Sequence, residues 1–256
     1  MELSASIELL FKEAGEDFAD RVRAAADAGI TVVEIWQHSN KDLRSLRRAL
    51  DTCRSRLWTL LVESRAPLAD RETHKAFVEQ VHLAARAAVE LGCERIVTGS
   101  GIGFPYMKRA PQHEIVVDAL KAGAEAAAGH GVVLVLENLN TRVDHPGTLF
   151  DRTSECLAAI NEVHSPGIGL LYDVYHSLQM RESPRDELRD HMALVSHIQI
   201  ADLPDRTEPG AGRIDWSAQL RDLKSLGYDG PVGLEYWPTT DSVRSLEHIR
   251  RIIREL

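Results

Sequence analysis

Four successive apolar runs in the second half of the chain each end in a polar residue that can bind a metal ion or move a proton. The runs end at Glu137, Asp173, Gln199 and Glu235. Carboxylate and amide oxygens are ligands for divalent cations, and paired carboxylates perform general acid–base catalysis. Each carboxylate shares its strand face with the residue two positions earlier, because side chains alternate along a strand. We therefore expect these groups to face one another if the four strands end at the same edge.

Three carboxylates brought together in this way repel one another strongly, and a bound divalent cation relieves that repulsion. The sequence therefore predicts a metal site formed by Glu137, Asp173, Gln199 and Glu235. A ligand set made only of oxygen atoms favours Mg²⁺ or Mn²⁺ over zinc, which tends to select His and Cys.

Five further residues follow strand ends and are predicted to bind substrate. They are His176, Arg206, Glu208, Asn138 and Trp36. Beside a metal, His176 can bind substrate or transfer protons, and a rim arginine can clamp a carboxylate or a hydroxyl group. Trp36 can equally well pack in the core. His197 shares the face of Gln199 one layer deeper, and we interpret it as an interior histidine whose hydrogen bonds are satisfied.

Strand-like and helix-like segments alternate along the whole chain and must position these residues. Strands are predicted at residues 3–10, 30–36, 56–62, 95–99, 132–137, 167–173, 194–200 and 232–235. Helices are predicted at residues 18–28, 42–53, 74–91, 112–130, 153–163, 185–191, 216–226 and 242–255. Eight such units with apolar strands predict an α/β fold, a single (β/α)₈ TIM barrel over residues 1–256, with its active site at the C-terminal ends of the strands.

An open doubly wound sheet is the main alternative for this pattern, and it usually has a Gly-rich nucleotide turn after its first strand. No such turn follows residues 3–10, and the glycine cluster at residues 99–103 runs into Phe104 and Pro105 instead of a helix. No lysine lies between Lys121 and Lys224, so the fifth to seventh strands cannot supply a Schiff-base amine. No Gly-rich helix start follows the last two strands, which favours an unphosphorylated substrate.

The overall charge is acidic, because 39 acidic and 30 basic side chains give a formal net charge of −9. This balance repels phosphate backbones and anionic membranes, so we expect neither nucleic acid nor a membrane as a partner. No apolar run approaches the roughly 20 residues of a membrane span, and the N-terminus lacks a signal-like pattern, so we expect a cytoplasmic protein. Cys53, Cys93 and Cys156 are far apart and are predicted to be reduced thiols.

Five segments carry a resemblance to a known family. They are residues 136–142 (LENLNTR), 172–176 (YDVYH), 197–201 (HIQIA), 204–209 (PDRTEP) and 233–236 (GLEY). They resemble the xylose isomerase-like TIM barrels of the sugar isomerase and epimerase group, and most closely the hydroxypyruvate isomerases, and the resemblance covers nearly the whole chain. It implies one divalent metal on Glu137, Asp173, Gln199 and Glu235. It also implies that the two glutamates are the acid/base pair and that His176 and Arg206 contact substrate.

Three comparisons with the family's patterns refine this expectation. Many ketose epimerases have His at the position of Gln199, so the glutamine favours the hydroxypyruvate isomerase branch. The stretch Arg206-Thr207-Glu208 replaces the Asp-x-His ligands of endonuclease IV, a distant relative, and argues against a three-zinc nuclease site. The loop at residues 63–72 is shorter than the Gly-rich loop usual in hydroxypyruvate isomerases, which predicts a more open pocket and a larger substrate.

The expected activity is metal-dependent isomerisation of a small unphosphorylated hydroxy-carbonyl compound through an enediolate. Hydroxypyruvate and tartronate semialdehyde are the type of sugar or keto-acid substrate implied, with Glu137 and Glu235 as acid and base. A ketose 3-epimerase and a lyase acting on 3-oxo-glycosides are alternatives that would use the same metal site. A glycosidase and a non-catalytic sugar-binding protein are further alternatives. A homo-oligomer is an expectation that rests on the resemblance alone.

Overall fold

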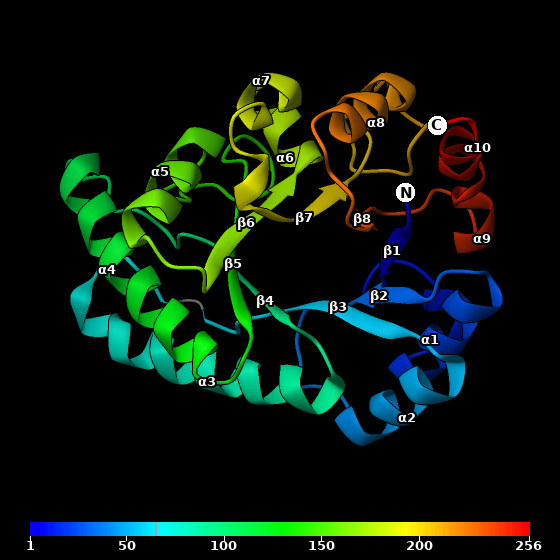
Figure 1. Ribbon diagram of the computed structural model, residues 1–256, viewed down its shortest axis with the longest axis horizontal. Coiled ribbons are helices and arrows are strands. Elements are labelled where there is room, and N and C mark those ends of the chain that lie inside the picture. Colours follow the sequence, from blue (N-terminus) through cyan, green and yellow to red (C-terminus); the bar gives the residue numbers. More distant parts are fainter. Residues whose placement is uncertain (65) are drawn as a thin grey trace.

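Eight parallel strands close into a barrel in chain order in the computed structural model, which describes residues 1–64 and 66–256 (Figure 1). The strands are β1 (Leu3–Ser6), β2 (Val32–Glu34), β3 (Arg56–Leu61), β4 (Arg95–Thr98), β5 (Val133–Glu137), β6 (Ile168–Asp173), β7 (Val195–Ile200) and β8 (Val232–Leu234). Backbone pairing of β1 with β8 completes the closure. The predicted single (β/α)₈ barrel is confirmed.

Helices follow the strands and lie around the outside of the barrel (Figure 1). They are α1 (Phe18–Asp27), α2 (Leu43–Cys53), α3 (His74–Leu91), α4 (Arg109–Ala128), α5 (Thr153–Val163), α6 (Val174–Gln179), α7 (Pro184–Leu188), α8 (Trp216–Ser225), α9 (Ser242–Ser245) and α10 (Glu247–Glu255). Short 3₁₀ turns are η1 (Lys12–Ala14), η2 (Arg71–Thr73) and η3 (Met192–Leu194). Gly92, with φ of 70°, ends α3 in the left-handed conformation that glycine adopts without strain.

The structure corrects three predicted elements. The strand predicted at residues 3–10 ends at Ser6, because its carbonyl accepts from the N–H groups of Leu9 and Leu10 and turns the chain. The helix predicted at residues 242–255 is divided at Leu246 into α9 and α10. The stretch after Asp173, where no helix was predicted, forms α6, which the Asp173 side chain caps.

Two apolar clusters lie on the two sides of the sheet. The larger one packs between the strands and the outer helices. The smaller one fills part of the barrel interior and consists of Val97, Val135 and Leu171, with Leu61 and Val133 packed against it. Full burial of such side chains contributes about 1.5–3 kcal/mol each. The interior also contains buried polar residues from β1, β2, β3 and β7, namely Ser4, Glu34, Thr59, His197 and Gln199.

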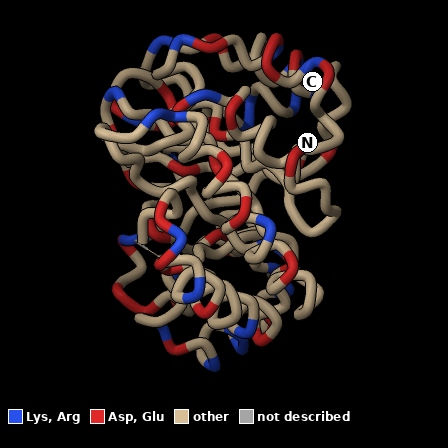
Figure 2. The backbone as a smooth tube through the Cα atoms, turned by 90° about the vertical axis from the view of Figure 1, so that its left-hand side faces the viewer, with Lys and Arg blue, Asp and Glu red and all other residues tan. Residues whose placement is uncertain are grey.

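Acidic and basic residues are interspersed over the outer elements (Figure 2). The three cysteines are free, with Cys93 and Cys156 buried, in agreement with the predicted reduced thiols. Among the described residues, no helix combines the length and the apolar character that crossing a membrane requires.

Candidate active site

The strand register brings the polar strand ends together at one edge of the barrel. Glu137 pairs with Leu171, and Asp173, two residues beyond Leu171, pairs with Gln199. Gln199 in turn pairs with Gly233, two residues before Glu235. Residues two apart on a strand face the same side, so this register places the side chains of Glu137, Asp173, Gln199 and Glu235 on the same, inner face of the barrel. Ligand atoms of Glu137, Asp173 and His176 all lie within 4.8 Å of one another.

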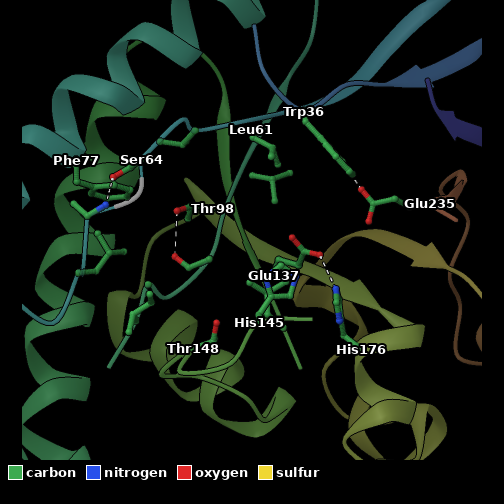
Figure 3. A pocket seen from close by; sticks show the side chains of 18 of the residues that line it. Trp36, Leu61, Ser64, Phe77, Thr98, Glu137, His145, Thr148, His176 and Glu235 are labelled. Carbon is green, nitrogen blue, oxygen red and sulfur yellow. Dashed lines mark hydrogen bonds and ion pairs between the residues drawn. The ribbon is translucent and has the colours of Figure 1, made fainter. Parts of the chain in front are cut away.

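A cavity of about 510 Å³ opens above this edge (Figure 3). Its polar end is lined by Trp36, Glu137, His176, Arg206 and Glu235. A small second cavity of about 10 Å³ is lined by Glu34, Glu137, Gln199 and Glu235 among others. This volume is close to the space that one water-sized sphere requires. Gln199 therefore faces the same small space as Glu137 and Glu235.

Both oxygens of Glu235 accept hydrogen bonds. The Trp36 indole Nε1 donates to Oε1 at 2.6 Å, and Nη2 of Arg206 donates to Oε2. Arg206 also lies 3.6 Å from Oδ2 of Asp173, so its guanidinium group interacts with two of the three carboxylates. Arg206 has φ of 57°, a left-handed conformation that costs a residue other than glycine of order 1–3 kcal/mol. The N–H of Trp237 donates to the Arg206 carbonyl at 2.8 Å and helps to hold it there.

The carboxylates destabilise one another in the absence of a bound cation. Burial, followed by repulsion from Glu235 and Asp173, raises the pKa of Glu137 well above its usual range. Burial raises the pKa of Asp173 to about 7, although the nearby Arg206 opposes the change. Burial also raises the pKa of Glu235, against the lowering effect of Arg206 and Trp36. A single guanidinium group therefore does not balance the charge of this cluster.

A pH dependence follows for the metal-free protein. An acid whose pKa is raised by folding binds protons more tightly in the folded state, so the free energy of unfolding falls as pH rises from about 4 to about 7. We expect the melting temperature in EDTA to fall between pH 5 and pH 8. The fall should be smaller in Asp173→Asn and in wild-type protein with saturating Mn²⁺. Equal slopes for wild type and Asp173→Asn, measured by differential scanning calorimetry, would contradict this electrostatic assignment.

His176 is held as a neutral hydrogen-bond donor. Its Nδ1 lies 2.6 Å from Nδ2 of Asn140, and Oδ1 of Asn140 accepts from two backbone N–H groups, which fixes the direction of that amide. Nδ1 is therefore the acceptor, and Nε2 carries the hydrogen. Burial lowers the pKa of His176 well below its usual value. Nε2 lies 3.5 Å from Asp173 and 3.7 Å from Glu137. A protonated Nε2 suits contact with a substrate oxygen and lacks the lone pair that metal ligation needs.

Gln199 presents its carbonyl oxygen as an acceptor without a donor. Its Nε2 donates to Oε2 of Glu34 at 2.8 Å, and Oε1 is buried with no hydrogen-bond partner among the described residues. An unpaired buried acceptor costs about 1–3 kcal/mol. A divalent cation would satisfy this oxygen and neutralise the neighbouring carboxylates. The oxygen donors of Glu137, Asp173, Gln199 and Glu235 are chemically suited to such an ion.

Two predicted substrate-binding residues, Asn138 and Glu208, are not among the residues that line the main cavity. Asn138 donates to the carbonyl of Asp173 at 3.2 Å and accepts from its N–H at 2.8 Å, so it joins the ends of β5 and β6. Glu208 accepts from the N–H and the hydroxyl of Thr239 at 2.9 and 2.5 Å. It thereby ties the loop after β7 to the loop after β8, and it is absent from the residues that line the main cavity.

The sequence pattern was not used to identify one polar residue that shapes the site. Glu34 ends β2 and hydrogen-bonds Gln199. The signal for Glu34 was the same as for the other strand ends, a carboxylate that closes an apolar run at Val32 and Val33. The apolar lining of the main cavity was also unpredicted, and it includes Leu61, Val62, Leu68, Phe77, Val97 and Leu139.

Comparison with known proteins agrees with this architecture. Residues 22–252 match the family described as the xylose isomerase-like TIM barrel. The chain is 30% identical over 244 residues to a 2-oxo-tetronate isomerase of Cupriavidus necator, covering 92% of each chain. It is 27% identical over 255 residues to a hydroxypyruvate isomerase of Escherichia coli, covering 96% of this chain and 97% of the relative.

A solved structure has a similar fold over nearly the whole chain. The crystal structure of an AP endonuclease, family 2, from Brucella melitensis matches with a TM-score of 0.89 at 27% identity, over 98% of this chain and 99% of that one. The family match and the full-length relatives agree with the resemblance seen in the strand-end motifs. This chain belongs to the xylose isomerase-like TIM barrel family.

Proposed function

We propose that this protein is a metal-dependent isomerase of an unphosphorylated hydroxy-carbonyl compound and that Glu235 and Glu137 remove a proton from one carbon and return one to its neighbour. The observation that carries the proposal is that Glu137 and Glu235 line the polar end of a substrate-sized cavity and share a small second cavity with the unpaired Gln199 oxygen. Asp173 lies beside Glu137. The relatives named as isomerases support the same class of reaction.

Mg²⁺ or Mn²⁺ would be held by the oxygens of Glu137, Asp173, Gln199 and Glu235, which are hard ligands of the kind these ions prefer. When bound, such an ion polarises the carbonyl group, acidifies the adjacent C–H bond and stabilises negative charge on oxygen. This charge stabilisation is what an enediolate requires.

The side chains around the cavity suggest a division of roles. Trp36 and Arg206 donate to Glu235 and favour its ionised form, so we assign Glu235 as the base that removes the proton from the hydroxyl-bearing carbon. Glu137 lines the same end of the cavity and is assigned as the acid that delivers a proton to the neighbouring carbon. The hydroxyl proton passes to the former carbonyl oxygen, and His176 Nε2–H is placed to hydrogen-bond these oxygens. The substrate loses one carbon-bound proton to Glu235 and gains one from Glu137, so the product is an isomer and no oxidant is needed. Proton exchange with solvent returns the two glutamates to their starting states.

The size of the cavity favours a substrate larger than a three-carbon keto acid. A volume of about 510 Å³ lies in the range of sites for larger ligands. Phe77 and Ser64 lie at the end of the cavity opposite Glu235 (Figure 3). We call this end the apolar arm, and the apolar residues Leu68 and Leu139 also line the cavity. It supports a ketose 3-epimerase or a 3-oxo-glycoside lyase as the second candidate, since both begin with the same proton abstraction.

Filling the apolar arm should discriminate substrates by size. Ala66 lines the cavity and is half-buried, so we expect Ala66→Phe to fold and to raise KM at least tenfold for six-carbon ketoses or 3-oxo-glucosides. KM for hydroxypyruvate should change less than threefold. Ala110→Phe, at an exposed position outside this cavity, is the matched control. An unchanged KM for the larger substrates in Ala66→Phe would contradict the assignment of the arm.

Product analysis tests the proposed function. Hydroxypyruvate, a four-carbon 2-oxo acid, ketoses and 3-oxo-glucosides are each incubated with Mn²⁺-loaded protein and analysed by NMR. An aldehyde or ketone isomer of the substrate supports the isomerase. An inverted hydroxyl carbon or a released aglycone instead identifies the epimerase or the lyase. Absence of any product, with metal bound, would overturn all three.

A further inference from the structure

Glu34 lies inside the barrel at the centre of a hydrogen-bond network and is 2% exposed. Its Oε1 accepts from the Ser4 hydroxyl at 2.5 Å and from Nε2 of His197 at 2.9 Å. Its Oε2 accepts from the Thr59 hydroxyl at 3.2 Å and from Nε2 of Gln199 at 2.8 Å. Four donors from β1, β3 and β7 therefore surround one carboxylate, which also borders the small cavity.

The Trp58 side chain fixes the tautomer of His197. The Trp58 indole Nε1 donates to Nδ1 of His197 at 3.0 Å. An indole N–H only donates, so Nδ1 must be the acceptor and Nε2 must carry the hydrogen given to Glu34. His197 is completely buried and cannot exchange these roles with water. His197 can therefore only donate a hydrogen bond to Glu34.

Gln199 is not locked in the same way, because rotating its amide by half a turn exchanges the oxygen and the nitrogen. The carboxylate of Glu34 accepts only hydrogen, so it selects the orientation in which the NH₂ group faces Glu34. The oxygen then faces the small cavity that Gln199 shares with Glu137 and Glu235.

Gly233 on β8 provides an independent indication that this arrangement is tightly built. A Cβ atom at position 233 would lie 2.4 Å from Oε1 of Glu34, 2.7 Å from Nε2 of His197 and 2.9 Å from Cγ of Gln199. These contacts are too short for any side chain at this position. The missing side chain of Gly233 therefore leaves the space in which the three residues meet.

We propose that Glu34 is a positioning residue that orients the Gln199 amide so that its oxygen, and not its NH₂ group, faces the cation. The inference rests on the metal site of the proposed function. In this role Glu34 acts through Gln199, and both of its oxygens accept hydrogen bonds from protein donors. A partner that only accepts hydrogen bonds is what this role requires, and a carboxylate is the common side chain that meets the requirement.

The exchange of Glu34 for Gln has a specific consequence. The new amide must point its NH₂ group either at His197 Nε2–H, which Trp58 locks, or at the NH₂ group of Gln199. The second clash is relieved by rotating Gln199, which turns its NH₂ group toward the cation site. We therefore expect the dissociation constant for Mn²⁺ to rise about 10–100-fold in Glu34→Gln, the range usual for partners that orient metal ligands. Isothermal titration calorimetry measures this without substrate.

A second substitution distinguishes orientation from a merely structural role. In Trp58→Phe the lock on His197 is absent, so Nε2 of His197 can accept from Gln at position 34 and Gln199 can return to its original orientation. We expect Trp58→Phe alone to change Mn²⁺ affinity less than threefold and to restore most of the affinity when combined with Glu34→Gln. In a Gln199→Ala background, Glu34→Gln should have no further effect. Loss of packing alone would produce neither the rescue nor the non-additivity.

The outcomes separate this inference from the proposed function. Unchanged Mn²⁺ affinity in folded Glu34→Gln, or no rescue by Trp58→Phe, overturns the role of Glu34. If wild-type protein binds no Mn²⁺, the metal site and the inference both fail. If Mn²⁺ binds and Glu34→Gln weakens it, but no substrate turns over, the inference stands and the proposed function fails. Should Glu34→Gln not fold, NMR of wild-type protein with labelled glutamine decides. Mg²⁺ should shift the Gln199 carbonyl carbon strongly, and an unshifted carbon would overturn the proposal.

Discussion

Replacing Glu137 with Gln is expected to lower kcat by about 10²–10⁴, the usual contribution of a general acid or base, while the barrel stays folded. Gln matches the shape of Glu but cannot deliver a proton. Glu137 is also a buried carboxyl group whose pKa is raised well above its usual range, so its ionised form destabilises the metal-free protein near neutral pH. The variant should therefore melt at the same or a higher temperature than wild type in EDTA at pH 8.

This combination of lost turnover and retained stability is the specific expectation. Glu125→Gln, at an exposed position on α4, is the matched control and should leave both kcat and the melting temperature unchanged. Glu235→Gln should lose turnover to a similar extent because it removes the assigned base. A kcat within tenfold of wild type for either Glu137→Gln or Glu235→Gln, with metal bound, is incompatible with the acid/base pair.

The second large effect is expected at Asp173, where two functions of one side chain can be separated. Oδ1 accepts from the N–H groups of Tyr175 and His176 at 2.7 and 3.3 Å and so caps α6. Asn can keep this cap but lacks the negative charge, whereas Ala lacks both. We expect Asp173→Asn and Asp173→Ala each to weaken Mn²⁺ binding at least 100-fold. Only Asp173→Ala should also lose the stability of the cap, about 1 kcal/mol.

Calorimetric titration with Mn²⁺ and thermal melts in EDTA measure the two effects separately. Asp215 is exposed and caps α8 by accepting from the Ala218 N–H at 3.0 Å. Asp215→Asn is therefore the matched control, because it makes the same exchange at a helix start away from the active-site carboxylates. It should leave Mn²⁺ affinity unchanged. Mn²⁺ affinity in Asp173→Asn within threefold of wild type would remove Asp173 from the proposed ligand set.

The barrel and the polar end of the site could be predicted because each depends on short-range patterns. Apolar runs that end in Glu137, Asp173 or Glu235 mark strands whose C-terminal ends meet in a parallel barrel, so topology alone brings these residues to one edge. The side-chain parity of a strand then gives the direction in which each residue points. The same reasoning missed α6, because Asp173 was interpreted only as a ligand and not also as a helix cap.

The interior network could not be predicted, because its contacts join residues that are far apart in the chain. Glu34 meets Ser4 and Thr59 from neighbouring strands, and it meets His197 and Gln199 across more than 160 positions. The strand predicted at residues 30–36 also ran past Glu34, which the structure places at the end of β2 beside an irregularity in the pairing with β3. Because the predicted strand ended two residues too late, Glu34 was not recognised as a strand-end carboxylate like Glu137, Asp173 and Glu235.

The roles of Asn138 and Glu208 show a related limit. Both follow strand ends, where the sequence predicts contact with substrate, yet their side chains hydrogen-bond Asp173 and Thr239 and hold neighbouring loops together. Polar residues at a barrel edge serve either to contact ligand or to satisfy backbone groups, and the sequence pattern is the same for the two. Only the positions of the partner atoms distinguish them.

Deuterium exchange is the most direct test of metal-assisted proton abstraction by Glu235, because it detects the abstraction without assuming a product. The protein is incubated in D₂O with hydroxypyruvate and with larger hydroxy-carbonyl substrates, first with Mn²⁺ or Mg²⁺ and then with EDTA, and Glu235→Gln is treated in parallel. We expect deuterium at the carbon next to the carbonyl group only in the metal-loaded wild-type protein. Equal exchange in EDTA, or undiminished exchange in Glu235→Gln, would contradict a metal-assisted abstraction of the proton by this residue.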